Sequence, residues 1–164
     1  MALHFSKQEF SNRKKNIIKS MKEENLDALL IFRQESMYWL TGYDTFGYVF
    51  FQTLILDQKG NIILLSRAPD LRQAQNTSNI KDIRIWVDKD NSNPTEDLKL
   101  ILIELNLKGK KIGIEYEAYG MTGRNALRIN SSLKNYCSVE DHSELITKHR
   151  VIKSQEEILY VKKA

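Results

Sequence analysis

The sequence predicts an α/β domain with a mixed β-sheet flanked by helices. Two apolar strands form a hairpin between residues 48 and 66, and helical and strand segments alternate after it. Because a hairpin supplies antiparallel strands and crossover helices supply parallel strands, one sheet should contain both kinds. The composition agrees, since 41% hydrophobic residues in a chain of 164 can form one buried core.

In the first half of the chain, apolar spacing and turn residues define the elements. Ser6 and Glu9 form a capping box before residues that are apolar at helical intervals. Gly42 can supply the positive φ that ends a helical turn, and Gly60 lies in the hairpin turn. The predicted elements are a helix at 6–24, a strand at 26–32, a helical turn at 36–40, and strands at 48–56 and 62–66.

In the second half of the chain, strands and helices alternate. Asn93 and Pro94 are typical of an N-cap and of the first helical position. We interpret Asp141, His142 and Ser143 as the polar cap of a following helix. The predicted elements are helices at 69–78, 94–105 and 122–133, and strands at 83–87, 111–115 and 137–140.

The last residues of the sequence begin another helix. Ser154 and Glu157 predict a second capping box, and Glu156 and Glu157 lie where the helix dipole favours anions. About ten residues of helix are too few to be stable in water without packing. We therefore divide the chain into a domain at residues 1–147 and a segment at 148–164 that leads into a further domain.

Charge and cysteine content limit the classes of function that this protein can have. The 25 basic and 21 acidic residues are interleaved without a dense basic run, so we expect no nucleic-acid partner. The single Cys137 excludes an internal disulfide and fits a reducing, cytoplasmic location. No apolar segment has the length of a membrane span or the pattern of a targeting signal, so no membrane partner is expected.

The usual patterns of metal binding and nucleophilic catalysis are missing. His4, His142 and His149 do not have ligand spacing, so the sequence predicts no metal site and no catalytic residue in this chain. Cys137 lies in an apolar strand, where a thiol is generally inert packing.

Two segments could bind a ligand or a partner. Residues 38–51 contain seven aromatic side chains around two glycines. Because large rings give much contact area at little entropic cost, core packing and recognition both stay open for this segment. Arg67 and Arg72 form a weaker candidate that could contact a small anion, although an ion pair between Arg67 and Asp70 is the preferred interpretation.

Three motifs, in this order, resemble the N-terminal domain of the creatinase and prolidase family. They are Trp39-Leu-Thr-Gly42-Tyr43, Lys111-Ile-Gly-Ile-Glu115-Tyr116 and Arg150-Val-Ile-Lys-Ser154-Gln-Glu-Glu157-Ile. The similarity covers nearly the whole chain, and the Xaa-Pro dipeptidase and ectoine-hydrolase-like branches are the most similar. The resemblance implies a ribonuclease-H-like mixed sheet flanked by helices.

The resemblance also implies a supporting role in a larger hydrolase. In this family the N-terminal domains pair in a homodimer, and a loop reaches over the neighbouring protomer's active site. That loop corresponds here to residues 43–50, with Tyr43, Asp44, Phe46 and Tyr48 near the substrate. The sequence has no arginine in this loop, although members that act on creatine have one there, which argues against creatinase activity.

The catalytic chemistry is expected outside this chain. In the family's peptidases, a pita-bread domain binds a pair of divalent metals, Mn, Co or Zn, and residues 148–164 would contain the start of its first helix. The parent would be a Xaa-Pro dipeptidase or a related amidohydrolase. Its partners would be its own C-terminal catalytic domain, a second copy, and a peptide or small amide substrate.

Two other hypotheses remain. The chain could be a free-standing module that binds a small ligand or a peptide through the aromatic segment and Arg67 and Arg72. A ribonuclease-H-like nuclease is the least favoured hypothesis. It would need carboxylates such as Asp57, Glu115 and Glu140 to converge on a magnesium ion.

Overall fold

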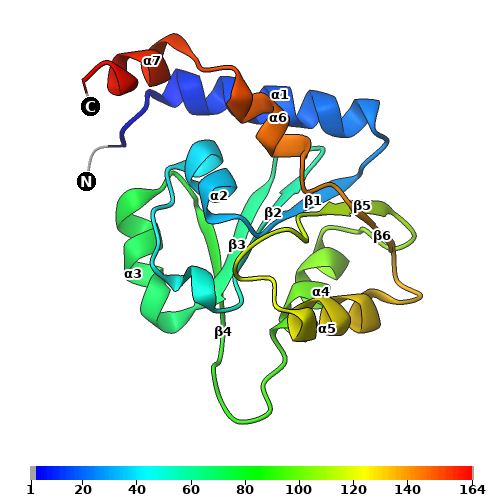
Figure 1. Ribbon diagram of the computed structural model, residues 1–164. Coiled ribbons are helices and arrows are strands. Elements are labelled where there is room, and N and C mark those ends of the chain that lie inside the picture. The colour runs from blue at the N-terminus through cyan, green and yellow to red at the C-terminus, as the bar shows by residue number, and fades with distance from the viewer. Residues whose placement is uncertain (1–2, 164) are drawn as a thin grey trace.

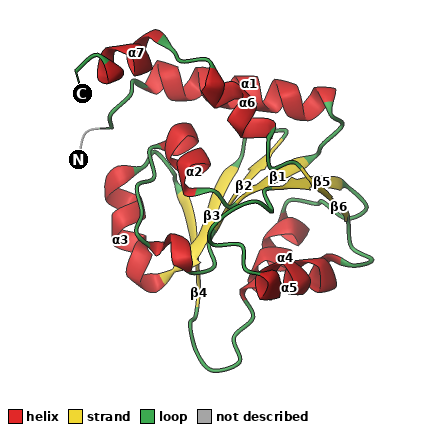
Figure 2. Cartoon of the chain, in the orientation of Figure 1, coloured by secondary structure: helices red, strands yellow, loops and turns green. Residues whose placement is uncertain are grey.

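The computed structural model describes residues 3–163 and contains one six-stranded sheet with helices on both faces (Figures 1 and 2). The strand order is β4-β3-β2-β1-β5-β6. The strands are β1 (Ala28–Ile31), β2 (Thr53–Asp57), β3 (Ile62–Arg67), β4 (Asp82–Trp86), β5 (Lys111–Ile114) and β6 (Ser138–Asp141). This order, with the meander β1-β2-β3 on one side and the later strands β5 and β6 beside β1, is ribonuclease-H-like.

The sheet is mixed, as the sequence predicts. Strand β2 is antiparallel to both β1 and β3, whereas the pairs β1-β5, β5-β6 and β3-β4 are parallel. The hairpin therefore supplies the antiparallel part and the crossover connections supply the parallel part. The two kinds of connection predicted from the sequence are confirmed.

Helices cover the two faces of the sheet in two groups. Helices α1, α2, α3 and α6 pack on one face, and α4 and α5 pack on the other. Successive residues of β1 point to opposite faces, so Leu29 contributes to the first core and Leu30 to the second. The helices are α1 (Lys7–Glu23), α2 (Gln34–Thr41), α3 (Ala68–Thr77), α4 (Pro94–Glu104), α5 (Gly123–Leu133), α6 (Leu145–Val151) and α7 (Gln155–Val161). No helix in residues 3–163 combines the length and apolar character needed to cross a membrane.

The strand predicted at 48–56 is shorter in the structure. Gly47–Val49 form a 3-10 helix, η1, and the strand begins only at Thr53. The last pairing of β1 is between Ile31 and Leu54, so the preceding aromatic residues have no ladder partner. They form a loop instead, which we call the aromatic loop (residues 43–52).

Two predicted caps are formed differently. The Ser6 hydroxyl accepts a hydrogen bond from the Glu9 amide, but the Ser6 amide donates to Glu156 rather than to Glu9. The Glu9 carboxylate instead accepts from the buried Arg13, which needs a counter-charge. Before α6, the N-cap position is Glu144. The predicted cap residues Asp141 and Ser143 instead close a turn, in which Asp141 accepts from Ser143.

The capping box at the start of α7 is confirmed. The Ser154 hydroxyl accepts from the Glu157 amide, and the Ser154 amide donates to the Glu157 carboxylate. The helix itself does not project away from the domain. It lies beside the N-terminal end of α1 (Figure 1).

Candidate functional site

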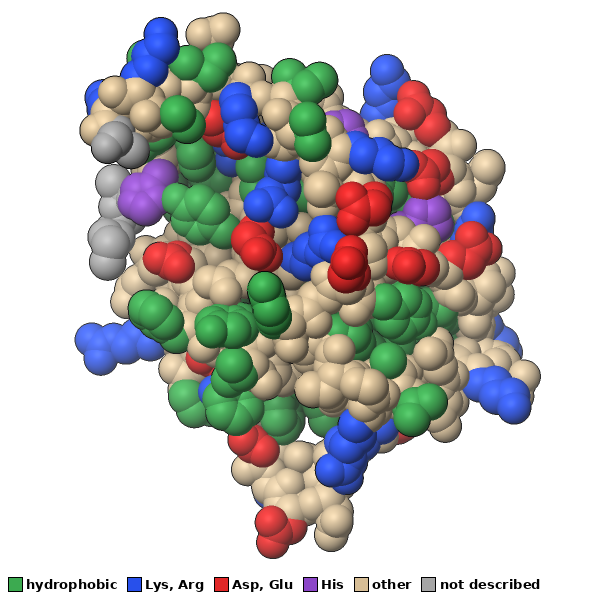
Figure 3. Space-filling model, viewed as in Figure 1, with side chains coloured by type: hydrophobic (Ala, Val, Ile, Leu, Met, Phe, Trp, Pro, Cys, Tyr) green, Lys and Arg blue, Asp and Glu red, His purple; other side chains and the backbone are tan. Residues whose placement is uncertain are grey.

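The aromatic loop exposes an apolar surface between α2 and β2. Phe46 is 85% exposed, and Tyr48, Val49 and Phe50 are exposed as well. Figure 3 shows hydrophobic side chains gathered on this face of the molecule, above the loop that follows β4. Single exposed apolar side chains are common, but four in one short loop indicate a contact surface.

Tyr43 does not belong to this surface. It is fully buried, and its hydroxyl donates to Gln52 Oε1 at 3.0 Å. Burial raises the pKa of Tyr43 above its ordinary value. The structure thus separates the four predicted loop residues, with Tyr43 in the core and Asp44, Phe46 and Tyr48 outside.

Two contacts hold the backbone of the aromatic loop against the rest of the domain. The Asp44 amide donates to Thr77 Oγ1 of α3 at 3.2 Å. On the other side, the Tyr48 carbonyl oxygen lies against Gly120, where a Cβ atom would come within 2.4 Å of it. The segment that carries the exposed rings thus has a hydrogen-bonded amide at Asp44 and a backbone packed closely against Gly120 at Tyr48.

Arg67 supports the same loop. Its Nε lies 3.3 Å from Asp70 Oδ2 and its Nη1 lies 3.6 Å from Asp88 Oδ2, so the predicted pair of Arg67 and Asp70 is confirmed. Its guanidinium also faces the ring of Phe50. Arg72 is exposed on α3, and its side chain makes no hydrogen bond or ion pair within residues 3–163. The structure does not bring the two arginines to a shared group, and their contact with an anion stays a prediction.

A second feature, which sequence reasoning missed, lies where β1 and β5 end. These strands are parallel neighbours, but β1 leads into α2 on one face and β5 leads toward α5 on the other. Ligands of open α/β sheets usually bind at such a switch point. A cavity of about 500 Å³ opens here, lined by Arg33, Glu35, Tyr116, Glu117, Ala118 and Tyr119.

At this switch point, the Glu115 carboxylate binds the backbone amides at the N-terminal end of α2. This fully buried carboxylate accepts from the amides of Phe32 at 3.0 Å and Arg33 at 2.8 Å, and from the Ser36 hydroxyl at 2.7 Å. Burial raises the pKa of Glu115 to about 7, against the lowering effect of these hydrogen bonds. The only sequence signal was a single glutamate directly after a short apolar strand.

The carboxylates of the nuclease hypothesis do not converge. Asp57 pairs in register with Ala28 at the beginning of β1, whereas Glu115 follows the end of β5. Asp57 is also engaged by the amide and side chain of Asn61. The two groups lie at opposite ends of the sheet, so the geometry gives the nuclease hypothesis no support.

The donors among the described residues do not fit a pair of metal ions. Within residues 3–163, no three His, Cys, Asp or Glu side chains lie close enough together to hold one ion. The histidines have separate neighbours, namely Tyr38 for His4, Glu24 for His142 and Ser20 for His149. Burial raises the pKa of Cys137 to about 11, so the thiol stays protonated near neutral pH.

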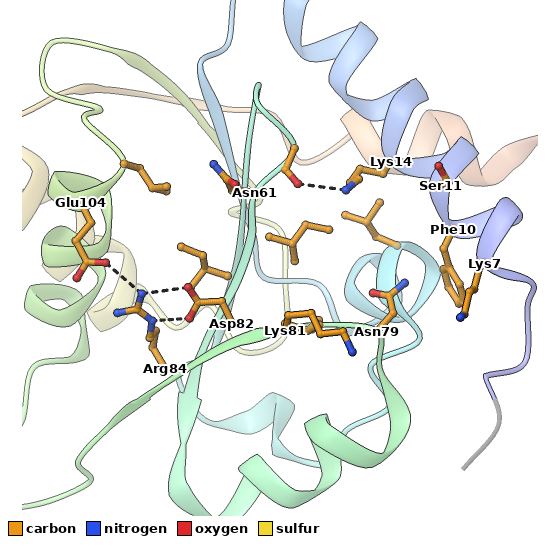
Figure 4. Close-up of a pocket in the computed structure, with 16 residues that line it drawn as sticks. Lys7, Phe10, Ser11, Lys14, Asn61, Asn79, Lys81, Asp82, Arg84 and Glu104 are labelled. Atoms are coloured by element: carbon orange, nitrogen blue, oxygen red, sulfur yellow. Dashed lines mark hydrogen bonds and ion pairs between the residues drawn. The ribbon is translucent and has the colours of Figure 1, made fainter.

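Another cavity, of about 720 Å³, lies between α1, the β2-β3 turn and the edge strand β4. Figure 4 shows that several of its polar groups are bound to one another. Arg84 binds Asp82 and Glu104, and Lys14 donates to the Gly60 carbonyl oxygen. These contacts stabilise the edge of the sheet. Among the residues that line this cavity, no nucleophilic side chain is hydrogen-bonded to a base.

Comparisons with known proteins agree with the motifs. A sequence model of the creatinase/prolidase N-terminal domain matches residues 13–152. An uncharacterized hydrolase/peptidase, y4tM, from Sinorhizobium fredii is 27% identical over 99% of this chain and 43% of its own length. The ectoine hydrolase of Halomonas elongata is 25% identical over the whole chain and 43% of its own length. The chain thus spans less than half the length of these relatives.

Solved structures share the fold. A dipeptidase from Pyrococcus horikoshii has a TM-score of 0.72 and 25% identity over 90% of this chain and 38% of its own. A prolidase from Thermococcus sibiricus has a TM-score of 0.77 and 21% identity over 94% of this chain and 40% of its own. A proline dipeptidase structure from Streptococcus pneumoniae, with a TM-score of 0.69 and 18% identity, is covered over 98% of its chain by 85% of this one. Because the family's sequence model matches residues 13–152, most of the chain, the chain belongs to the creatinase/prolidase N-terminal domain family.

Proposed function

We propose that this chain is the non-catalytic N-terminal domain of a metal-dependent Xaa-Pro dipeptidase or aminopeptidase-like hydrolase. In this proposal it forms the homodimer contact, and its aromatic loop shapes the substrate site of the neighbouring protomer. The similar proteins, several of them dipeptidases and prolidases, support the hydrolase class. The observation that carries the loop's role is the exposed ring of Phe46 on a braced backbone.

The physical case rests on rigidity and apolar area together. Exposed rings on a mobile loop would lose entropy on binding, but this loop is tied at Asp44 and Tyr48 before any ligand arrives. Phe46 and Tyr48 can then cover the apolar part of a peptide or small amide substrate. The divalent metal pair, Mn, Co or Zn, would belong to the following catalytic domain, because the donors among the described residues do not fit it.

The proposal is tested in the full-length protein with Phe46→Ala and Tyr48→Ala. Each change should raise KM or lower kcat while the metal content stays the same, because the loop contacts substrate and not metal. Leu127→Ala is the matched control, since Leu127 is equally apolar and exposed but lies on α5. Unchanged kinetics in both loop variants would exclude the loop's role, and a monomer by sedimentation would exclude the dimer.

A second candidate function is a free-standing module for small ligands or peptides. The cavity at the end of β1 and β5 favours it, because the 89% exposed Tyr119 and the half-buried Tyr116 line it without a second domain. Calorimetric titration of this chain with Xaa-Pro dipeptides separates the two. Dipeptide binding by the wild type that disappears in Tyr119→Ala would favour the free-standing binding module. If no heat of binding is measured, the hypothesis that this chain is one domain of a larger hydrolase is favoured.

A further inference from the structure

Helix α7 is docked on α1 although none of its side chains is buried. With seven residues it is too short to persist in water by itself. Leu159, Tyr160 and Val161 all remain exposed, and the Tyr160 ring meets the Phe5 ring edge-on at a centroid distance of 5.3 Å. The polar contacts that dock the helix come from its first turn and from Tyr160.

The first contact is with Arg13 of α1, which is only 3% exposed. Its Nε donates to Glu9 at 2.9 Å and its Nη1 donates to the Trp39 carbonyl oxygen at 2.7 Å. Its Nη2 lies 3.3 Å from Glu157 Oε1 of α7. A buried cation is stable only with counter-charges, and Glu157 provides the second one beside Glu9.

Aromatic rings pack around the guanidinium of Arg13 and complete the site that binds Glu157. Its guanidinium carbon lies 4.2 Å from the centre of the Phe5 ring and 4.9 Å from that of Trp39. The Trp39 indole N–H donates to the same Glu157 oxygen at 3.0 Å. Arg13 and Trp39 thus converge on a single carboxylate oxygen.

Glu157 is at the same time the capping residue of α7. Its other oxygen accepts from the Ser154 amide at 2.8 Å, so one carboxylate both starts the helix and docks it. Next to it, Glu156 accepts from the Ser6 amide at 2.9 Å and from the Ser6 hydroxyl at 2.6 Å. The beginnings of α1 and α7 are therefore joined through two adjacent glutamates.

The chain before α7 allows this contact to open. Residues 152–154 lie between α6 and α7 outside both helices, and Val151 and Ile152 are exposed. Release of α7 would not require α6 to unfold. It would break the polar contacts of Glu156 and Glu157 and the hydrogen bond from the Tyr160 hydroxyl to the His4 carbonyl oxygen.

We infer that Arg13 and the Trp39 indole form a latch for Glu157, which fixes α7 on this domain and opens when the charge of Arg13 or of Glu157 is lost. In the proposed two-domain hydrolase, the latch would set the orientation of whatever follows α7. This second statement rests on the proposed function, whereas the latch itself does not.

Glu157→Gln is the sharpest variant for testing the latch. Glutamine has a single accepting oxygen, so it can keep the bond from the Ser154 amide or the bond from the Trp39 indole but not both, and it removes the charge facing Arg13. Amide hydrogen exchange of α7 in this chain should become about tenfold faster, because the change removes the ion pair between Glu157 and Arg13 Nη2 and one hydrogen bond of the Glu157 carboxylate. Trp39→Phe, which keeps a ring but removes the N–H, should accelerate it by about three- to tenfold.

The matched control is Lys19→Met, which lies on α1, the same helix as Arg13. Lys19 pairs with Glu23 at 3.8 Å, but both side chains are well exposed, so its loss should leave the exchange of α7 unchanged. Wild-type exchange rates in both Glu157→Gln and Trp39→Phe would overturn the latch. Equal acceleration in Lys19→Met would overturn it too, because the effect would then be general destabilisation of α1.

Activity of the full-length protein tests the second statement separately. Glu157→Gln should lower kcat with unchanged metal content if the latch orients the following domain. Faster exchange with unchanged kcat would keep the latch and reject its role in orientation. Because exchange is measured without substrate, its result does not depend on whether the aromatic loop shapes the substrate site.

Discussion

The guanidinium carbon of Arg67 lies 3.3 Å from the centre of the Phe50 ring. Arg67 is the last residue of β3, and Phe50 ends the 3-10 turn of the aromatic loop. The contact therefore fastens the exposed loop to the rigid sheet. Asp70 and Asp88 hold the guanidinium from two other elements, so its plane is fixed in position under the ring.

Arg67→Ala should loosen the aromatic loop more than it destabilises the fold. It removes a cation–π contact and the ion pairs with Asp70 and Asp88, and the expected loss in the free energy of unfolding is about 1–3 kcal/mol. Amide exchange of residues 45–52 should accelerate, because these residues have no ladder partner to hold them. Urea denaturation and exchange measure the two effects.

Arg72→Ala is the control for this variant. Arg72 is exposed on the neighbouring α3, and surface substitutions of this kind change stability by less than about 0.5 kcal/mol. An Arg67→Ala loop that exchanges no faster than the Arg72→Ala loop would show that the ring contact does not fasten it.

Gly120→Ala should disturb the aromatic loop from the opposite side. The new Cβ would lie 2.4 Å from the Tyr48 carbonyl oxygen, and a backbone atom cannot rotate out of the way. Overpacking of this kind costs about 1–3 kcal/mol, which urea denaturation can measure. Gly123→Ala is the control, because no atom lies within 4 Å of a Cβ there and alanine favours the α5 helix. Equal stability of the two variants would contradict the close contact.

Most of the sheet could be predicted because each strand carries its own signal. The strand at 111–115 is a short apolar run with β-branched residues, and β5 (Lys111–Ile114) forms there. The hairpin turn was equally clear, since Gly60 has the positive φ that its position requires. Local sequence patterns were sufficient for elements whose structure depends on residues close to one another in the sequence.

Prediction was incomplete where distant residues decide the local structure. Tyr43 and Phe46 look alike in sequence, but Tyr43 finds Gln52 as a partner and becomes core, whereas Phe46 remains outside. Glu9 fits a capping box by spacing, yet the buried Arg13 takes its carboxylate. The composition of residues 38–51 left core packing and recognition both open, and only the fold shows which rings are exposed.

The buried Glu115 should make stability depend on pH. Burial raises its pKa in the folded chain to about 7 from an ordinary value of 4.5, so the folded state binds the proton more tightly than the unfolded state. The stabilisation from this group is therefore complete below about pH 4.5 and is lost as the pH rises through about 7. At about 1.4 kcal/mol per pKa unit, the change amounts to about 3 kcal/mol.

Urea denaturation of the wild type and of Glu115→Gln between pH 4.5 and pH 8 measures this dependence. Glutamine keeps an oxygen that can accept from the amides of Phe32 and Arg33, but it cannot lose a proton. The wild type should lose stability relative to Glu115→Gln as the pH rises, because only the wild type must then either bury a charge or open the start of α2. Parallel pH profiles of the two proteins would mean that the Glu115 carboxyl has an ordinary pKa in the folded chain.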